Sequence, residues 1–128
     1  MVGIVVASHS RRLAEGVVEL AQMMAPEVPM AAAGGMDDGS TGTSYKKILG
    51  AMTQVYSEDG VAILMDMGSA AMTAEMAIEF LDKPKLKLVD CPLVEGAVAA
   101  AIESYQGKSL EEIERCAMEA GSLKKISD

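Results

Sequence analysis

The chain has 128 residues, half of them apolar, which suits one compact domain spanning residues 1–128 and leaves no room for two ordinary ones. Its formal net charge of -8, without a basic block, argues against nucleic-acid partners and against an anionic membrane surface. The N-terminal apolar run comes before its charged residues, whereas a signal peptide has them in the opposite order. No apolar stretch is long enough to span a bilayer, so we expect a cytoplasmic protein.

The first third of the chain predicts a strand, a helix and a second strand. Residues 2–7 form a short run of Val, Ile and other apolar residues, typical of a strand covered on both faces. Residues 12–24 have helical spacing, and residues 28–33 form a weaker strand that ends at two glycines. The predicted apolar face of the helix consists of Leu13, Val17, Leu20 and Met24.

The longest irregular segment is GGMDDGSTGT, residues 34–43. A loop this rich in Gly, Asp, Ser and Thr lies on the surface and often carries function. Residues 44–56 return to helical spacing, with Thr43 or Ser44 as the predicted N-cap. The apolar positions of this helix are Tyr45, Ile48, Met52 and Val55.

The most apolar run, residues 61–65, predicts a central buried strand that Asp66 ends. Gly68 then turns the chain, and we expect a helix from Ser69 to about Leu81.

The last third predicts one more strand and two helices. Residues 85–90 form the strand, and the Ala-rich residues 93–105 form a helix. Ser109 and Glu112 have the spacing of a capping box and open a final amphipathic helix. The apolar face of that helix consists of Leu110, Ile113 and Ala117.

Repeated strand–helix units imply an α/β fold: a four-stranded parallel sheet with helices on both faces, three layers in all. We expect the strand order 2-1-3-4, which places the ligand site between strands one and three, at their carboxyl ends.

With one Phe, three Tyr and no Trp, most of the eleven methionines are expected to pack in the interior. The two cysteines have neither metal spacing nor a disulfide framework, so we expect reduced thiols.

His9 follows the first strand and Asp66 follows the third. If these strands are neighbours, their tips lie about 4.8 Å apart and the two side chains can meet. A carboxylate that accepts the proton of one imidazole nitrogen fixes the tautomer and leaves the other nitrogen free to attack phosphorus. The pair therefore predicts a histidine that accepts a phosphoryl group, with the free nitrogen assigned as Nε2 and Asp66 on the Nδ1 side.

A phosphoryl group needs hydrogen-bond donors, which helix N-termini supply. The first candidates are Gly68, Ser69 and Ala70, and the second are Thr41, Gly42 and Thr43. Arg11 and Arg12 are expected to face solvent or a protein partner.

Simpler interpretations stay open for the same residues. His9 could be a loop histidine without a role, and Asp66 could cap the following helix. The Gly-rich segment could be a plain loop, and Asp37 and Asp38 lack the further carboxylates that a cation site needs.

Four blocks of sequence resemble the DhaM family, the phosphotransferase subunits of PTS-dependent dihydroxyacetone kinases, which have the mannose-type IIA fold. The blocks occur in order over about residues 1–105. They read SHSRRLAEG (8–16), AAAGGMDD with TGTS (31–44), MDMGSAAMTAE (65–75) and PLVEGAVAA (92–100). Mannose-type transporter IIA domains typically have a His-Gly pair, whereas this chain has His9-Ser10, which favours the kinase branch.

The resemblance implies a phosphotransferase that accepts phosphate from the carrier HPr on His9, assisted by Asp66, and passes it to ADP bound on the subunit DhaL. The ATP formed there phosphorylates dihydroxyacetone on DhaK. It also implies a homodimer, with no cofactor or metal on this chain, because nucleotide and magnesium belong to the partner. Some members carry further phosphocarrier domains, and since the printed sequence ends at Asp128 we expect HPr to be a separate protein.

Three other functions fit the same pattern less well. One is the IIA component of a mannose-type sugar transporter, which has the same chemistry and another acceptor. A receiver-like signalling domain phosphorylated on Asp66 would need an acidic pair after the first strand, where this chain has Ser8-His9-Ser10. A non-enzymatic module would use the Gly-rich loop to bind an anion.

Overall fold

The computed structural model describes residues 1–127. Among them, four parallel strands form one sheet in the order β2-β1-β3-β4, which confirms the predicted fold class and strand order. The strands are β1 (Gly3–Ser8), β2 (Met30–Gly34), β3 (Val61–Met65) and β4 (Leu86–Val89). The helices are α1 (Arg11–Met24), α2 (Tyr45–Val55), α3 (Gly68–Leu81), α4 (Leu93–Tyr105) and α5 (Leu110–Glu119), followed by a 3₁₀ turn, Ala120–Ser122.

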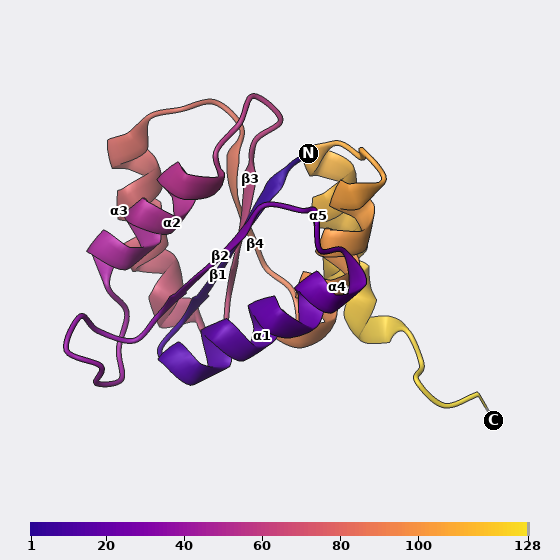
Figure 1. The fold of residues 1–128 in the computed structure, drawn as a ribbon, viewed down its shortest axis with the longest axis horizontal. Helices are drawn as coiled ribbons and strands as arrows, with labels where there is room; N and C mark the ends of the chain where they lie inside the picture. The colour runs from indigo at the N-terminus through magenta and orange to yellow at the C-terminus, as the bar shows by residue number, and fades with distance from the viewer. Residues whose placement is uncertain (128) are drawn as a thin grey trace.

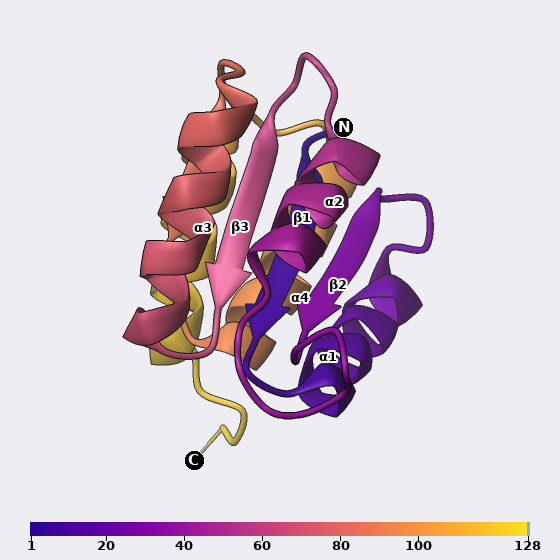
Figure 2. The same ribbon diagram turned by 90° about the vertical axis from the view of Figure 1, so that its left-hand side faces the viewer.

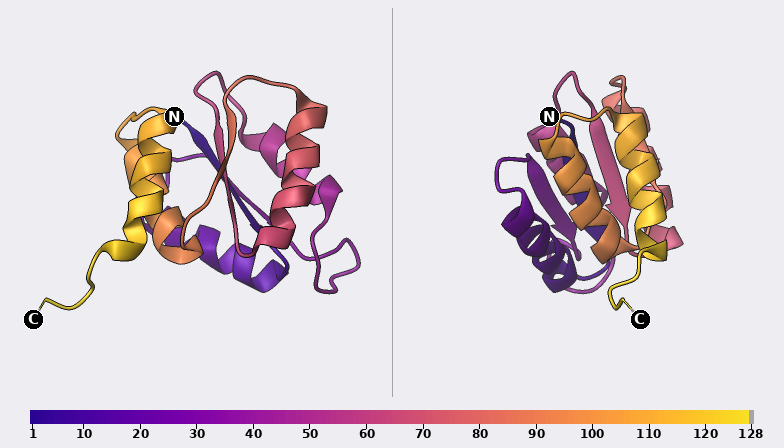
Figure 3. Two further views of the ribbon diagram at one scale, coloured as in Figure 1. Left: turned by 180° about the vertical axis from the view of Figure 1, so that it is seen from behind. Right: turned by 90° about the vertical axis from the view of Figure 1, so that its right-hand side faces the viewer.

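Helices cover both faces of the sheet, so the molecule has three layers (Figure 1). Helices α2 and α3 lie over one face, as Figure 2 shows, and α1, α4 and α5 lie over the other (Figure 3). Successive strand residues alternate between these layers. Ile4 and Val6 of β1 pack with α1, α4 and α5, whereas Val5 and Ala7 pack with α2 and α3. Both faces of β1 are therefore buried, which explains its continuous apolar sequence.

Polar side chains begin three of the helices. Ser10 caps α1, and Ser44, one of the two predicted candidates, caps α2 by accepting the Lys47 N–H at 3.1 Å. Ser109 and Glu112 form the predicted capping box at the start of α5.

The buried face of α1 differs from the prediction. Ala14, Val17 and Ala21 are buried, whereas the predicted Leu13, Leu20 and Met24 are each at least 40% exposed. At the start of α1 the helix approaches the end of β2 closely, because a Cβ built at Gly34 would lie 2.7 Å from the Ala14 Cβ, and this leaves no room for a leucine at position 14.

The prediction that most methionines pack in the interior is wrong. Met30 and Met52 are buried and Met65 is partly buried, but eight others are exposed. The buried positions of α3 and α4 are occupied by small residues, mainly alanine, and Met72 and Met76 of α3 lie outside them. The exposed methionines are Met1, Met23, Met24, Met36, Met67, Met72, Met76 and Met118.

Among residues 1–127, no helix combines the length and the hydropathy that crossing a membrane requires.

Candidate active site

The sheet brings the ends of β1 and β3 together. Ala7 pairs with Met65, and the Asp66 N–H donates to the Ala7 carbonyl at 3.2 Å. His9 directly follows β1 and Asp66 directly follows β3. Both residues therefore lie at the carboxyl ends of the two central strands, where the strand order reverses.

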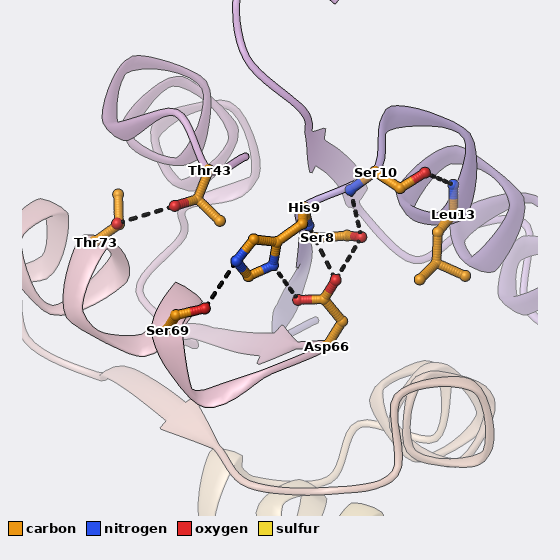
Figure 4. A network of polar contacts seen from close by, with 8 residues as sticks. All are labelled: Ser8, His9, Ser10, Leu13, Thr43, Asp66, Ser69 and Thr73. Carbon is orange, nitrogen blue, oxygen red and sulfur yellow. Dashed lines mark hydrogen bonds and ion pairs between the residues drawn. The ribbon is translucent and has the colours of Figure 1, made fainter. Parts of the chain in front are cut away.

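The His9 and Asp66 side chains are in contact, as the sequence predicts (Figure 4). His9 Nδ1 lies 3.0 Å from Asp66 Oδ1. The other carboxylate oxygen, Oδ2, accepts the His9 backbone N–H at 3.0 Å and the Ser8 hydroxyl at 2.9 Å. The carboxylate is held on both sides, and it orients both the ring and the backbone of His9.

The charge on Asp66 decides where the ring proton lies. Burial raises the pKa of Asp66, but hydrogen bonds from the His9 backbone, the His9 ring and Ser8 outweigh it, so the pKa lies below its ordinary value. An ionised carboxylate only accepts hydrogen bonds, so the ring proton sits on Nδ1. The lone pair of a neutral ring is then on Nε2.

The Nε2 atom faces the beginning of α3. The Ser69 hydroxyl lies 2.8 Å from Nε2 and donates to it. Gly68 and Ser69 are the first two residues of α3, and their N–H groups have no acceptor within the helix. Ala70 is buried and its N–H already donates to the Met67 carbonyl at 3.0 Å. Of the first three candidate donors, Gly68 and Ser69 are therefore the available ones.

The second set of candidate donors lies in the loop between β2 and α2. Thr41 is exposed, and the Gly42 N–H donates to the His9 carbonyl at 2.9 Å. The Thr43 hydroxyl lies 3.1 Å from the Thr73 hydroxyl on α3. These two hydrogen bonds fix the loop beside His9.

A surface hollow adjoins the ring. Its lining includes His9, Arg11, Arg12 and Thr41. Both arginines are exposed on the first turn of α1, and Arg11 forms a loose ion pair with Glu15 at 3.5 Å. The His9 side chain is 23% exposed, so an approaching molecule can reach it.

Two polar residues of the site were not predicted from the sequence. Ser8 is fully buried, and its hydroxyl donates to Asp66 while accepting the Ser10 N–H at 3.0 Å. A serine at the end of an otherwise apolar strand was the available signal. Thr73 lies one helical turn after Ser69, and that i, i+4 spacing places both on one side of α3.

Other reactive groups lie outside this network. Burial, and then the neighbouring charge of Asp90, raise the pKa of the Cys91 thiol to about 11. Within residues 1–127, no cluster of three His, Cys, Asp or Glu side chains is placed to hold a metal ion. The groups that meet at the site itself are the His9 imidazole, the Asp66 carboxylate and the Ser69 hydroxyl at the start of α3.

Comparison with known proteins agrees with this architecture. The model of the EIIA-man family, described as "PTS system fructose IIA component", matches residues 3–114. The mannose/sorbose specific IIA subunit of the phosphotransferase system from Enterococcus faecalis superimposes with a TM-score of 0.61 at 19% identity, covering 98% of this chain and 94% of that one. The fold is thus that of the mannose-type IIA domains.

Two relatives are more specific. The phosphoryl donor subunit DhaM of PEP-dependent dihydroxyacetone kinase 2 from Listeria innocua is 37% identical over 117 residues, covering 88% of this chain and 94% of that protein. DhaM from Escherichia coli K12 is 39% identical over 132 residues, covering 98% of this chain but 28% of that protein. Within the mannose-type IIA class, the chain belongs to the DhaM family. It spans little more than a quarter of the length of the longer relatives.

Proposed function

We propose that this protein carries a phosphoryl group on His9 and is the phosphoryl donor subunit of a dihydroxyacetone kinase. The observation that supports it best is the imidazole held between Asp66 at Nδ1 and Ser69 at Nε2, at an accessible edge of the sheet. The names of the relatives point to the same system.

The transfer step follows from this arrangement. The Nε2 lone pair attacks the phosphorus of a donor phosphohistidine, and the donor N–P bond breaks with its electron pair returning to the donor ring. His9 then carries the phosphoryl group on Nε2 and keeps its proton on Nδ1, so its ring is positively charged. Asp66 stabilises that charge at 3.0 Å without taking the proton.

A phosphoryl group bonded to Nε2 lies beside the Ser69 hydroxyl, which now contacts that nitrogen. The Ser69 hydroxyl turns from Nε2 to a phosphoryl oxygen, and the N–H groups of Gly68 and Ser69 supply further donors at the positive end of α3. The donors are in place before the group arrives, so little reorganisation is needed. Onward transfer reverses the step: an acceptor oxygen attacks phosphorus and the N–P electron pair returns to Nε2.

The partners in this proposal are phosphorylated HPr as donor and ADP on DhaL as acceptor, in a system whose DhaK subunit holds dihydroxyacetone. Arg11 and Arg12 flank the hollow at His9 and are proposed to contact these proteins. The homodimer remains a prediction, which sedimentation velocity tests.

The test is to incubate the protein with phosphoenolpyruvate, enzyme I and HPr and to measure its mass. His9 is the one histidine of the chain, so a phosphate that is labile in mild acid, stable in alkali and absent from His9→Ala is assigned to it. We expect one phosphate on the wild type and none on a folded His9→Ala variant.

Two results would contradict the proposal. Full labelling of His9→Ala, or a phosphate released by alkali and hydroxylamine, would move the site to a carboxylate such as Asp66. Transfer from the labelled protein to a IIB protein, with none to DhaL holding ADP, would make it a transporter component instead.

A further inference from the structure

Ser8 is a fully buried polar residue at the end of β1. It pairs with Gly34 of β2, and its carbonyl accepts the Gly35 N–H at 3.1 Å. The sheet therefore fixes its backbone. Its hydroxyl lies between the Ser10 N–H, just before α1, and the Asp66 carboxylate, as Figure 4 shows.

These two contacts decide where the hydroxyl proton of Ser8 points. The Ser8 oxygen accepts the Ser10 N–H at 3.0 Å, which leaves the hydroxyl proton free to donate to Asp66 Oδ2 at 2.9 Å. An ionised carboxylate has no proton to donate in return. Ser8 is therefore the donor to Asp66, and a hydrogen bond to a charged group is stronger than one between neutral groups.

The hydroxyl restricts the rotation of the Asp66 carboxylate. Rotation about the last bond of an aspartate side chain is by itself only weakly restricted. Here Oδ2 is held by two donors, the Ser8 hydroxyl and the His9 N–H, and Oδ1 consequently faces His9 Nδ1 at 3.0 Å. Without the hydroxyl, one of these two donors would remain.

Water is poorly placed to replace the hydroxyl. Ser8 is fully buried, and the Asp66 side chain is 12% exposed. Removing a hydroxyl group opens a space smaller than a water molecule. The orientation of the carboxylate therefore depends on the Ser8 side chain itself.

The direction of the carboxylate matters for the reactivity of His9. The ring attacks phosphorus through Nε2 when its proton is on Nδ1, and a carboxylate that faces Nδ1 selects this tautomer. We propose that Ser8 is a positioning residue for phosphoryl transfer: its hydroxyl keeps the Asp66 carboxylate facing Nδ1, so that Nε2 keeps the attacking lone pair. This inference rests on the proposed function.

The test compares Ser8→Ala with Ser104→Ala. Ser104 is also fully buried, and its hydroxyl donates to the Val2 carbonyl at 2.6 Å, next to the opposite end of β1. Each variant loses one buried hydroxyl, but Ser104 has no contact with Asp66 or His9. Unfolding free energies of both variants, from urea titrations, show that each is folded under the assay conditions.

Three readouts are taken from each protein. The first is the single-turnover rate of phosphorylation by phosphorylated HPr. The second is the rate with the small molecule phosphoramidate: the Nε2–P bond forms, the P–N bond of phosphoramidate breaks, and its nitrogen leaves as ammonia. The third is ¹⁵N NMR of the His9 ring, which identifies the protonated nitrogen and which a general loss of stability does not change.

We expect Ser8→Ala to be phosphorylated about 3- to 10-fold more slowly by both donors, with more of its ring protonated on Nε2. Ser104→Ala should match the wild type in all three readouts. Wild-type rates and a wild-type tautomer in Ser8→Ala would overturn the inference, and so would slowing with HPr alone, which would indicate an effect on the protein partner. A wild type that neither donor labels would instead refute the proposed function.

A double-mutant cycle with Asp66→Asn asks whether Ser8 acts through Asp66. Because that variant lacks the carboxylate, adding Ser8→Ala to it should change the rate by no more than about twofold. The same fold-loss in both backgrounds would show that Ser8 acts independently of Asp66 and would contradict the proposal.

Ser8→Cys is the second variant, for the case that Ser8→Ala does not fold. It keeps a side chain of similar shape, but its S–H is a weak donor. We expect slower labelling by both donors and more Nε2 protonation here too, and wild-type values would count against the role of Ser8.

Discussion

Replacing Asp66 by asparagine keeps the shape of the side chain but removes the charge that orients His9. Asp66 accepts three hydrogen bonds, from the His9 ring at Oδ1 and from the His9 N–H and the Ser8 hydroxyl at Oδ2. Asparagine has one oxygen and one amide NH2, so it accepts on one side only. With the oxygen toward the His9 N–H, the NH2 faces Nδ1 and the ring proton moves to Nε2. With the opposite orientation, the NH2 faces the His9 backbone N–H, and both the His9 N–H and the Ser8 hydroxyl lose their acceptor.

Either orientation has a similar cost. In one orientation the His9 N–H loses its acceptor. In the other, the ring must carry its proton on Nδ1 while the asparagine NH2 faces that atom. Either arrangement costs about 1–3 kcal/mol. Since about 1.4 kcal/mol corresponds to a tenfold change in rate, we expect phosphorylation of Asp66→Asn to be slowed about 5- to 150-fold. Loss of the charge that stabilises the phosphorylated ring adds to this slowing.

Two measurements test this expectation. Rapid-quench single-turnover transfer from phosphorylated HPr gives the rate, and ¹⁵N NMR of the His9 ring identifies the protonated nitrogen. The control is Asp59→Asn, the same change on an exposed aspartate at the opposite end of the sheet. An Asp66→Asn protein with the wild-type rate and with the proton still on Nδ1 would refute the role assigned to the carboxylate.

The same variant has a pH signature. The pKa of Asp66 is lowered on folding: burial opposes this, but the hydrogen bonds from His9 and Ser8 outweigh it. A lowered carboxyl pKa contributes stability that is fully present above the unfolded value of about 3.9 and is lost as the pH falls through the folded value. Urea titrations from pH 7 to below pH 4 should therefore show a smaller acid loss of unfolding free energy in Asp66→Asn than in the wild type. Equal losses in the two proteins would contradict the lowered pKa.

Three further predictions concern packing and reactivity. A Cβ at Gly34 would lie 2.5–2.8 Å from three atoms of the first turns of α1, so Gly34→Ala should lower the unfolding free energy by about 1–3 kcal/mol in urea titrations. Thr73→Val should cost a similar ~1–3 kcal/mol, because it leaves the Thr43 hydroxyl unpaired, whereas Thr73→Ser should keep the wild-type value. Cys91, whose burial and neighbour Asp90 raise the thiol pKa to about 11, should react slowly with a thiol-specific disulfide reagent at pH 8 and rapidly in urea.

The order of the elements and the position of the site could be predicted from local pattern. Short runs of Val and Ile ended by polar residues marked β1 and β3, and parallel sheets built from strand–helix units have few possible orders. The contact of His9 with Asp66 followed from those two facts, because residues that end neighbouring parallel strands share one edge of the sheet.

Helix faces were less predictable, as α1 and the methionines show. Leucine and methionine at helical spacing indicate an apolar stripe, but alanines at the neighbouring positions offer a second stripe that is just as regular. Which stripe is buried depends on how closely the helix approaches the sheet. Around Ala14 that approach is close enough to exclude longer side chains, and the buried positions of α3 are likewise alanines.

The amino-acid sequence by itself determined the parallel α/β architecture and the chain positions of His9 and Asp66, because these depend on periodicity and on strand ends. Only the tertiary structure decided that Ser8 holds Asp66, that Ser69 faces Nε2, and that Met72, Met76 and Phe80 lie on the surface. Those facts depend on side-chain direction and on distances between elements far apart in the chain, which no local pattern encodes.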